Sequence, residues 1–270
     1  MPILELSKSE LSLIVGSSED ITVSLEGKTV TEGLKYDVKD TKVAKVENGK
    51  VTALAKGSTT VTVSLEGANS AVFTVETVGE GDFIEFGRYR QTGEGDNVDE
   101  WEPQPIEWKI LDIDTENNRV LLLSLYGLDA KAFDDKEPFE NVWKDSEICK
   151  WLNGDFYNTA FDETEKGKIQ STKLSDVDDT GTYNVFLLSK DELRNTKYFA
   201  DDESTNCLAT AYAKKHDALV ISNDNCLWWL RSPYPDTNDV VYSVRGDGYI
   251  RNQDVDSNSI VVRPALWINL

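Results

Sequence analysis

Apolar and polar residues alternate in short runs along residues 3–78. In residues 21–25 (ITVSL) and 61–65 (VTVSL) the aliphatic side chains would share one face and the hydroxyl groups the other, as in half-buried strands. Asn48 and Gly49 separate two such runs, and because both residues tolerate positive φ they predict a hairpin turn. This part of the chain therefore predicts an antiparallel sandwich of about seven strands.

The pattern changes after residues 79–82 (GEGD), a polar, glycine-rich segment expected to be a linker. Strand patterns follow at 83–90, 106–112 and 120–124, and helical patterns are found further on. The helices are expected at 145–153, after Asp162, after a capping box at 189–192, and over 205–216, where Leu208, Ala211 and Tyr212 would form one stripe. Since strands and helices do not alternate regularly, residues 83–270 predict a single α+β domain.

Two apolar segments, residues 226–233 (CLWWLRSP) and 261–267 (VVRPALW), bracket a polar run near the C-terminus. Their bulky side chains predict a packed frame that includes the end of the chain. The tryptophans of these segments are expected in the core, and the two arginines are expected to be structural hydrogen-bonding residues: Trp228, Trp229, Trp267, Arg231 and Arg263.

The polar run between these segments is the predicted ligand-binding surface. Its apolar residues could face the core while tyrosine and arginine point outward, and these two residue types dominate binding hot spots. An ordinary hairpin of solvated turns would have a similar composition, and that alternative remains open. The candidate ligand-binding residues are Tyr234, Asp236, Asn238, Asp239, Tyr242, Arg245, Asp247, Tyr249, Arg251, Asn252 and Asp254.

Charge excludes one class of partner. The chain has 28 Lys+Arg against 49 Asp+Glu, a formal net charge of -21, which repels nucleic-acid phosphates and anionic lipid surfaces. No nucleic-acid partner is therefore expected.

The sequence also lacks an apolar run long enough to span a bilayer, so no membrane insertion is expected. Its N-terminus lacks the basic and apolar segments of an export signal.

Catalytic and redox chemistry find little support. Cys149, Cys207 and Cys226 lack C-x-x-C spacing, so they are expected to be buried thiols, with a Cys207–Cys226 disulfide as the alternative. The single histidine, His216, follows two lysines and is expected to be a solvated surface imidazole without a catalytic partner. No catalytic residue is predicted, and carboxylate spacing alone cannot identify a glycosidase pair.

Two acidic segments have some features of calcium sites. Residues 176–181 (DVDDTG) imitate the start of an EF-hand loop, but Leu187 occupies the position of the required glutamate. Residues 254–258 (DVDSN) could also hold calcium. Solvated acidic turns explain both segments, so neither a metal site nor a cofactor is predicted.

Several motifs in the first part resemble the bacterial Ig-like group 2 domain. They are residues 13–16 (LIVG), 40–46 (DTKVAKV), 48–53 (NGKVTA) and 56–63 (KGSTTVTV). The resemblance covers nearly all of residues 3–78 and implies an all-β Ig-like sandwich over 1–79. Such domains are spacers or adhesive modules of bacterial surface proteins. Residues 36–39 (YDVK) depart from the usual family strand without changing the expected fold.

Motifs in the second part are similar to a domain family of unknown function, DUF6273. They lie at 105–111, 149–161, 185–189, 210–214, 228–233 and 262–267. This family is itself similar to the C-type-lectin-like fold of formylglycine-generating enzymes, which implies an α+β C-type-lectin-like domain over 83–270. The copper-dependent oxidase chemistry of those enzymes needs a close cysteine pair, for which no motif is found around Cys207 and Cys226.

The resemblances together imply a secreted or cell-surface bacterial binding or adhesion protein in which an Ig-like spacer presents a lectin-like domain. Its expected partner is an unknown surface protein or glycan ligand, and no enzymatic activity is expected. A glycan-active enzyme of the cell surface is the alternative. Lectin-like domains also serve as display scaffolds for diversity-generating retroelements, which favour Asn, Asp, Ser, Tyr and Gly, so residues 234–259 could be a variable surface.

Overall fold

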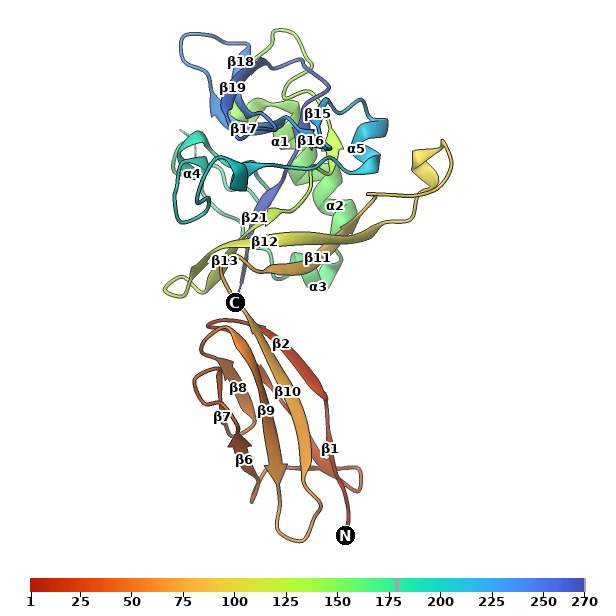
Figure 1. Cartoon of the computed structure of the whole chain (residues 1–270), viewed down its shortest axis with the longest axis vertical. Coiled ribbons are helices and arrows are strands. Elements are labelled where there is room, and N and C mark those ends of the chain that lie inside the picture. The colour runs from red at the N-terminus through yellow and green to blue at the C-terminus, as the bar shows by residue number, and fades with distance from the viewer. Residues whose placement is uncertain (178–179, 270) are drawn as a thin grey trace. The chain divides into compact units, whose positions relative to one another are not determined.

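A computed structural model describes residues 1–177 and 180–269 and divides into two compact units. The first unit contains Met1–Asp82 and Ile113–Asn118, and the second contains Phe83–Asp112 and Arg119–Asn269 (Figure 1). Each unit has its own buried core. No helix in the described residues is long and apolar enough to cross a bilayer.

Residues 1–82, all of which the structure describes, form ten strands and no helix. The strands are short and mostly separated by turns that contain glycine. They are β1 Leu4–Leu6, β2 Glu10–Ile14, β3 Ser18–Asp20, β4 Val23–Leu25, β5 Lys28–Val30, β6 Lys35–Val38, β7 Ala44–Glu47, β8 Lys50–Ala53, β9 Gly57–Ser64 and β10 Ala71–Val78.

The alternating pattern explains how this unit packs. Strands β2, β10, β9 and β6 form a four-stranded sheet, and two three-stranded sheets have the orders β1-β4-β5 and β3-β8-β7. Val61, Val63 and Val75 are fully buried in the core that these sheets share, because every second residue of a strand faces the same side. The predicted hairpin is confirmed: Asn48 and Gly49 have φ of 52° and 85° between β7 and β8.

The expected strand number and purely antiparallel pairing were wrong for this unit. Strand β10 pairs in parallel with β2 and antiparallel with β9. The unit also contains ten strands rather than about seven, because several alternating runs are interrupted after three or four residues. The result is a layered β-sheet domain with one apolar core.

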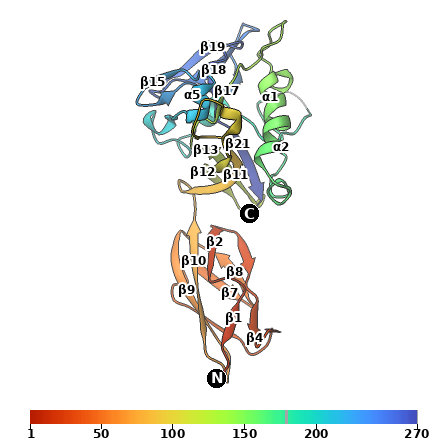
Figure 2. The same cartoon turned by 90° about the vertical axis from the view of Figure 1, so that its right-hand side faces the viewer.

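The second unit contains eleven strands among its described residues (Figures 1 and 2). Their bounds are β11 Phe83–Tyr89, β12 Gln104–Asp114, β13 Arg119–Ser124, β14 Asp129–Ala130, β15 Val220–Ser222, β16 Asn225–Cys226, β17 Trp228–Pro233, β18 Val240–Val244, β19 Ile250–Asp254, β20 Val261–Val262 and β21 Ala265–Asn269. The end of β12 is grouped with the first unit. Three of these strands confirm the patterns expected at 83–90, 106–112 and 120–124.

The helices of this unit are all short. They are α1 Glu147–Trp151, a π-helix Leu152–Phe156, α2 Tyr157–Ala160, α3 Glu163–Lys166, α4 Lys190–Leu193 and α5 Ala211–Lys215, with single 3₁₀ turns at Val98–Glu100, Trp143–Asp145 and Glu203–Thr205. The helix starts expected after Asp162 and at the capping box of Ser189 are confirmed as α3 and α4, and α3 also begins with a capping box, which was not predicted. The helix expected over 205–216 begins only at Ala211, because Thr210 caps it. Leu208 therefore lies outside it, 41% exposed.

The second unit has two large sheets around the C-terminal segments and a separate two-stranded sheet of β15 and β16. One large sheet has the order β11-β12-β13-β21, and the other has the order β14-β20-β17-β18-β19. Trp228, Trp229 and Leu266 are fully buried, and β21 pairs with β13 over five residues. The prediction that the end of the chain belongs to the core is confirmed. Trp267 is only half-buried, and the Arg119 guanidinium lies 4.2 Å from the centre of its ring.

The two arginines of the apolar segments have the structural roles expected of them. Arg231 is 2% exposed and pairs with Asp176 and Glu192. Arg263 is equally buried, and it donates to the carbonyl oxygens of Ser124 and Thr205. Asp176 is thus engaged by an arginine instead of standing free for a metal, while residues 178 and 179 of the EF-hand-like segment lie outside the described residues.

Candidate functional site

The predicted binding residues lie on strands β18 and β19 and in the adjoining loops. All eleven are half-buried or exposed. Strand β18 is anchored in the core, because its residues Val241, Ser243 and Val244 are fully buried. The two strands lie side by side (Figures 1 and 2) in continuous antiparallel pairing, so the backbone that presents these side chains is regular.

The strand register separates the expected surface into two faces. Tyr242 pairs with Asn252, and the next pair is Ser243 with Arg251. Because directly paired residues point to the same face of a sheet, Tyr242 and Asn252 share one face and Arg251 lies on the other. The expectation that tyrosine and arginine side chains would all point to one side was wrong. Arg251 stays exposed on the face of the buried Ser243.

An aromatic cluster forms on the Tyr242 side. The rings of Tyr234 and Tyr242 are 5.2 Å apart, and the Lys190 ammonium lies 3.8 Å from the centre of the Tyr242 ring. The buried Asn141 amide donates to the carbonyl oxygens of Thr237 and Val240 at 2.8 and 2.9 Å. Sequence reasoning missed Asn141 and Lys190, because both are distant along the chain.

The turn between the two strands is held by charge and by close packing. Hydrogen bonding to Arg245 lowers the pKa of Asp247 to about 2, so this carboxylate is ionised at neutral pH. Gly248 has φ of 84°, and a Cβ atom there would collide with the backbone of Asp202. The turn is therefore packed directly against the segment that follows α4.

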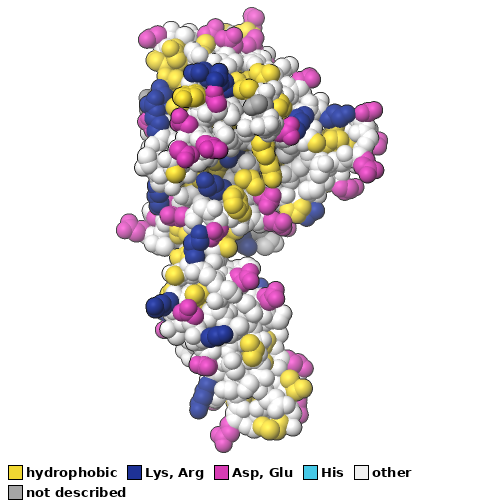
Figure 3. All heavy atoms as spheres, in the orientation of Figure 1, with side chains coloured by type: hydrophobic (Ala, Val, Ile, Leu, Met, Phe, Trp, Pro, Cys, Tyr) yellow, Lys and Arg dark blue, Asp and Glu magenta, His cyan; other side chains and the backbone are white. Residues whose placement is uncertain are grey.

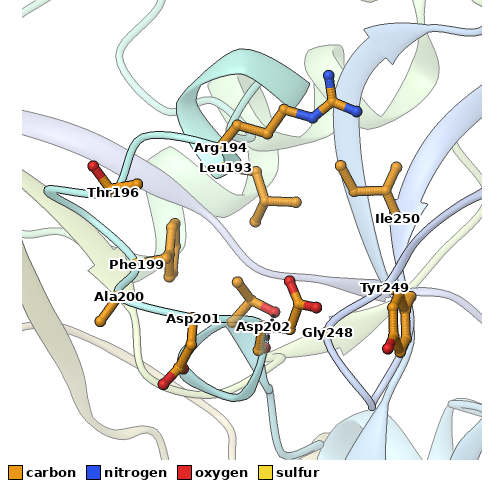
Figure 4. A pocket seen from close by; sticks show the side chains of 11 residues that line it. Leu193, Arg194, Thr196, Phe199, Ala200, Asp201, Asp202, Gly248, Tyr249 and Ile250 are labelled. Atoms are coloured by element: carbon orange, nitrogen blue, oxygen red, sulfur yellow. Dashed lines mark hydrogen bonds between the residues drawn. The ribbon is translucent and has the colours of Figure 1, made fainter.

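This packing creates a pocket of about 530 Å³ beside Tyr249 (Figure 4). Leu193, Phe199 and Ile250 supply apolar side chains to it. Tyr249 is 54% exposed and forms one wall, and Arg194, Asp201 and Asp202 add charged groups. A volume in this range is typical of ligand pockets, about 300–1,000 Å³.

The charged groups of this pocket are available to a ligand. One oxygen of the Asp201 carboxylate accepts from the Ser204 backbone N–H at 2.8 Å. Neither Arg194 nor Asp202 forms an ion pair with any residue that the structure describes. The Arg194 guanidinium points away from the two aspartates in Figure 4, so the pocket offers a cation and carboxylates at separate places around an apolar centre. We refer to it below as the Tyr249 pocket.

His216 has a partner that the sequence did not reveal, so the expectation of a free surface imidazole was wrong. Its Nδ1 lies 2.6 Å from Oδ1 of Asp129. The Tyr89 hydroxyl donates to the other carboxylate oxygen at 2.8 Å. The hydrogen bond to Asp129 raises the pKa of His216, and burial raises the pKa of Tyr89. The two partners are 87 residues apart, and no local motif links them.

All three cysteines are free and buried, as the first interpretation held, and the alternative disulfide is not formed. Cys207 and Cys226 are neighbours, because the Cys226 Sγ lies 3.1 Å from the Cys207 carbonyl oxygen. Within residues 1–177 and 180–269, no group of three or more His, Cys, Asp or Glu side chains is arranged to hold a metal ion.

Comparison with known proteins gives similarities of different strength. The N-terminal β-sheet domain of hyaluronate lyase matches residues 20–76, in agreement with the β-sheet structure of the first unit. A crystal structure of an intimin mutant from EHEC O157:H7 aligns over 98% of this chain and 97% of its own at 10% identity, with a TM-score of 0.25. A similarity that low supports no argument. No curated protein sequence matches this chain.

The second unit gives the decisive match. The model of the DUF6273 family, a domain of unknown function, matches residues 117–270. This match covers more than half of the chain and includes β13, all five α-helices, the Tyr249 pocket and the C-terminal segments. The chain therefore belongs to the DUF6273 family.

Proposed function

We propose that this protein is a non-enzymatic bacterial binding protein, secreted or held at the cell surface. In this proposal the first unit is an Ig-like spacer and the second is a C-type-lectin-like domain that presents a ligand-binding surface. The Tyr249 pocket is the centre of that surface. The aromatic cluster of Tyr234 and Tyr242 extends it, and the ligand is a surface protein or a glycan.

One observation carries the proposal: an exposed tyrosine stands over an apolar pocket on a rigid frame. Tyr249 is 54% exposed, whereas Leu193 and Phe199, which line the same pocket, are 5% and 4% exposed. Tyrosine gives a large contact area at a small cost in side-chain entropy, so it is frequent in binding surfaces. Rigid presentation adds affinity, because less order has to be imposed when the ligand binds.

The separated charges favour a ligand with both apolar and polar character. An apolar side chain or sugar face can contact Phe199 and Ile250, while Arg194 and Asp202 bind polar groups at the rim. The excess of acidic side chains, visible on the face shown in Figure 3, disfavours strongly anionic ligands. The exposed side chains within residues 234–259 would then be able to vary in sequence, as in a retroelement-diversified surface, without loss of the frame.

An array of glycans and bacterial and host surface proteins, probed with the full chain, tests this function. Tyr249→Ala is expected to weaken binding at least tenfold, because it removes one wall of the pocket. Asn158→Ala changes an exposed residue outside the pocket and outside the predicted binding surface, and it should bind as the unchanged protein does. Equal binding by both variants would contradict the assignment, and release of reducing ends from an array glycan would favour the alternative of a glycan-active enzyme.

A further inference from the structure

A second hollow of about 680 Å³ lies elsewhere on the second unit. Its walls come from residues 131–136, from α1 with the π-helix that follows it, and from the loop at 256–258. It has no lining residue in common with the Tyr249 pocket. Its volume is within the range of ligand pockets, about 300–1,000 Å³.

The aromatic wall of this hollow is Trp151. The Trp151 ring packs against Phe156 and Tyr89, with ring centres 5.3 and 6.4 Å away. The Lys131 ammonium lies 4.8 Å from the centre of the same ring. Trp151 nevertheless remains only half-buried, and it lines the hollow beside Ile148. An apolar ring surface is thus available in an otherwise polar site.

The π-helix explains why Trp151 is presented here. Leu152 and Phe156 are fully buried, and the Asn153 side chain fixes the turn by accepting from the backbone N–H of Asn184 and donating to the Val185 carbonyl oxygen at 2.9 Å each. The residues between these anchors, Gly154 and Asp155, line the hollow with Trp151. A π-helical turn within an α-helix occurs frequently at functional sites.

The lysines of the hollow are already paired. Lys136 and Lys150 both bind Glu147, at 2.6 and 2.7 Å. The Lys131 ammonium lies 3.5 Å from the buried carboxylate of Asp129, which fixes its position beside Trp151.

Three carboxylates of the hollow differ from these lysines in having no ion-pair partner among the described residues. Asp135, Asp155 and Asp256 are exposed and form no ion pair within the described part of the chain. The hollow therefore offers open carboxylates, one fixed ammonium group and the Asn258 amide.

We propose that this hollow binds a neutral pyranose sugar. A pyranose ring has apolar C–H faces and a rim of hydroxyl groups. The indole of Trp151 suits the face, while carboxylates accept and the amide and ammonium groups donate hydrogen bonds at the rim. Acidic sugars are disfavoured, because the unpaired carboxylates of the hollow and the net charge of -21 repel them. This is a second site, separate from the Tyr249 pocket.

Saturation-transfer-difference NMR on the full chain tests the proposal. The probes are neutral tetrasaccharides of glucose, mannose, galactose and N-acetylglucosamine, with a uronic-acid tetrasaccharide as the acidic control. At least one neutral probe is expected to give ring-proton signals at millimolar concentration, and the acidic control is not. Absence of signal for every neutral probe, or an equal signal for the acidic control, would overturn the proposal.

Two substitutions locate the sugar. A Cβ atom at Gly154 meets nothing within 4 Å, so Gly154→Gln should fold and fill the hollow, and Asp155→Ala should remove one acceptor without disturbing the core. Each is expected to weaken sugar binding at least tenfold. Asn158→Gln, an exposed change outside the hollow, is the control and should bind normally. Unchanged binding by both Gly154→Gln and Asp155→Ala would show that the sugar binds elsewhere.

Discussion

His216 and Asp129 form a hydrogen bond of 2.6 Å between Nδ1 and Oδ1, although Asp129 is 1% exposed and His216 is partly exposed. Lys131 and Tyr89 contact the same carboxylate, and Tyr212 packs against the imidazole with ring centres 4.3 Å apart. A buried carboxylate is stable only when it is paired and hydrogen-bonded. His216 therefore helps to stabilise the buried carboxylate of Asp129.

The first prediction concerns the titration of His216. The hydrogen bond to Asp129 raises its pKa, Asp99 acts in the same direction and Lys131 opposes it. The chain has one histidine, so its imidazole C–H signals in proton NMR are unambiguous. We expect a midpoint above the ordinary value of about 6.5, and a lower midpoint in Asp129→Asn. A midpoint that does not change in Asp129→Asn would contradict the pairing.

The second prediction concerns how the pairing of His216 with Asp129 makes the free energy of unfolding depend on pH. Because the folded pKa of His216 is raised, its contribution is fully present below the pKa of the unfolded chain. It is lost as pH rises through the folded pKa. The stability advantage of the unchanged protein over His216→Gln should therefore decrease as pH rises above about 6.5, the ordinary pKa of histidine. Urea unfolding at several pH values measures it, and a constant difference would contradict it.

The third prediction compares two glycines with left-handed backbone. Gly248 and Gly95 have φ of 84° and 85°, but only at Gly248 would a Cβ atom collide with neighbouring backbone. Gly95→Ala should cost about 1–2 kcal/mol of unfolding free energy, and Gly248→Ala about 2–5 kcal/mol. All seven tryptophans lie beyond residue 100, so denaturation followed by tryptophan fluorescence reports on the second unit. Equal costs would show that the turn at Gly248 is loosely packed.

The fourth prediction concerns Arg231, which pairs with Asp176 and Glu192 while 2% exposed. Arg231→Ala should destabilise the second unit by about 2–4 kcal/mol, because it leaves a cavity and removes the donor to the buried Leu187 carbonyl oxygen. Arg119→Ala, on the partly exposed Trp267, should cost about 1 kcal/mol. The tryptophan fluorescence assay measures both, and similar values would contradict the role of Arg231.

The fifth prediction is that the hairpin surface tolerates change. Joint replacement of its exposed and half-buried polar side chains should shift the melting temperature by only a few degrees, because surface substitutions usually stay within about 0.5 kcal/mol each. The joint variant changes Tyr242, Arg245, Tyr249, Arg251 and Asn252 to serine or alanine. Calorimetry of the full chain measures the shift. Failure of this variant to fold would show that these residues support the frame.

Local patterns predicted much of the fold because they depend on neighbouring residues. Alternation located β9, the turn at Asn48 and Gly49 followed from their backbone tolerance, and the capping box at Ser189 marked α4. The π-helix was not predicted, since the helical spacing of Ile148, Trp151 and Leu152 continues into it without a visible signal.

The candidate site was predicted less completely, because it depends on register and on distant contacts. The polar run was expected on a hairpin and lies on β18 and β19, yet the pairing of Ser243 with Arg251 puts this arginine on the sheet face opposite to that of Tyr242. A shift of one residue in register moves every side chain to the other face, and composition does not determine it. Phe199 and Asp202 joined Tyr249 only through the tertiary fold.

Strand β19 lies at the free edge of its five-stranded sheet. An edge strand exposes unpaired backbone groups that can recruit another chain and begin aggregation, and polar or charged side chains oppose this. Arg251, Asn252 and Asp254 are exposed on β19. The side chains proposed for recognition therefore also protect the protein from self-association, and a variant that binds through aliphatic residues at these positions would sacrifice solubility.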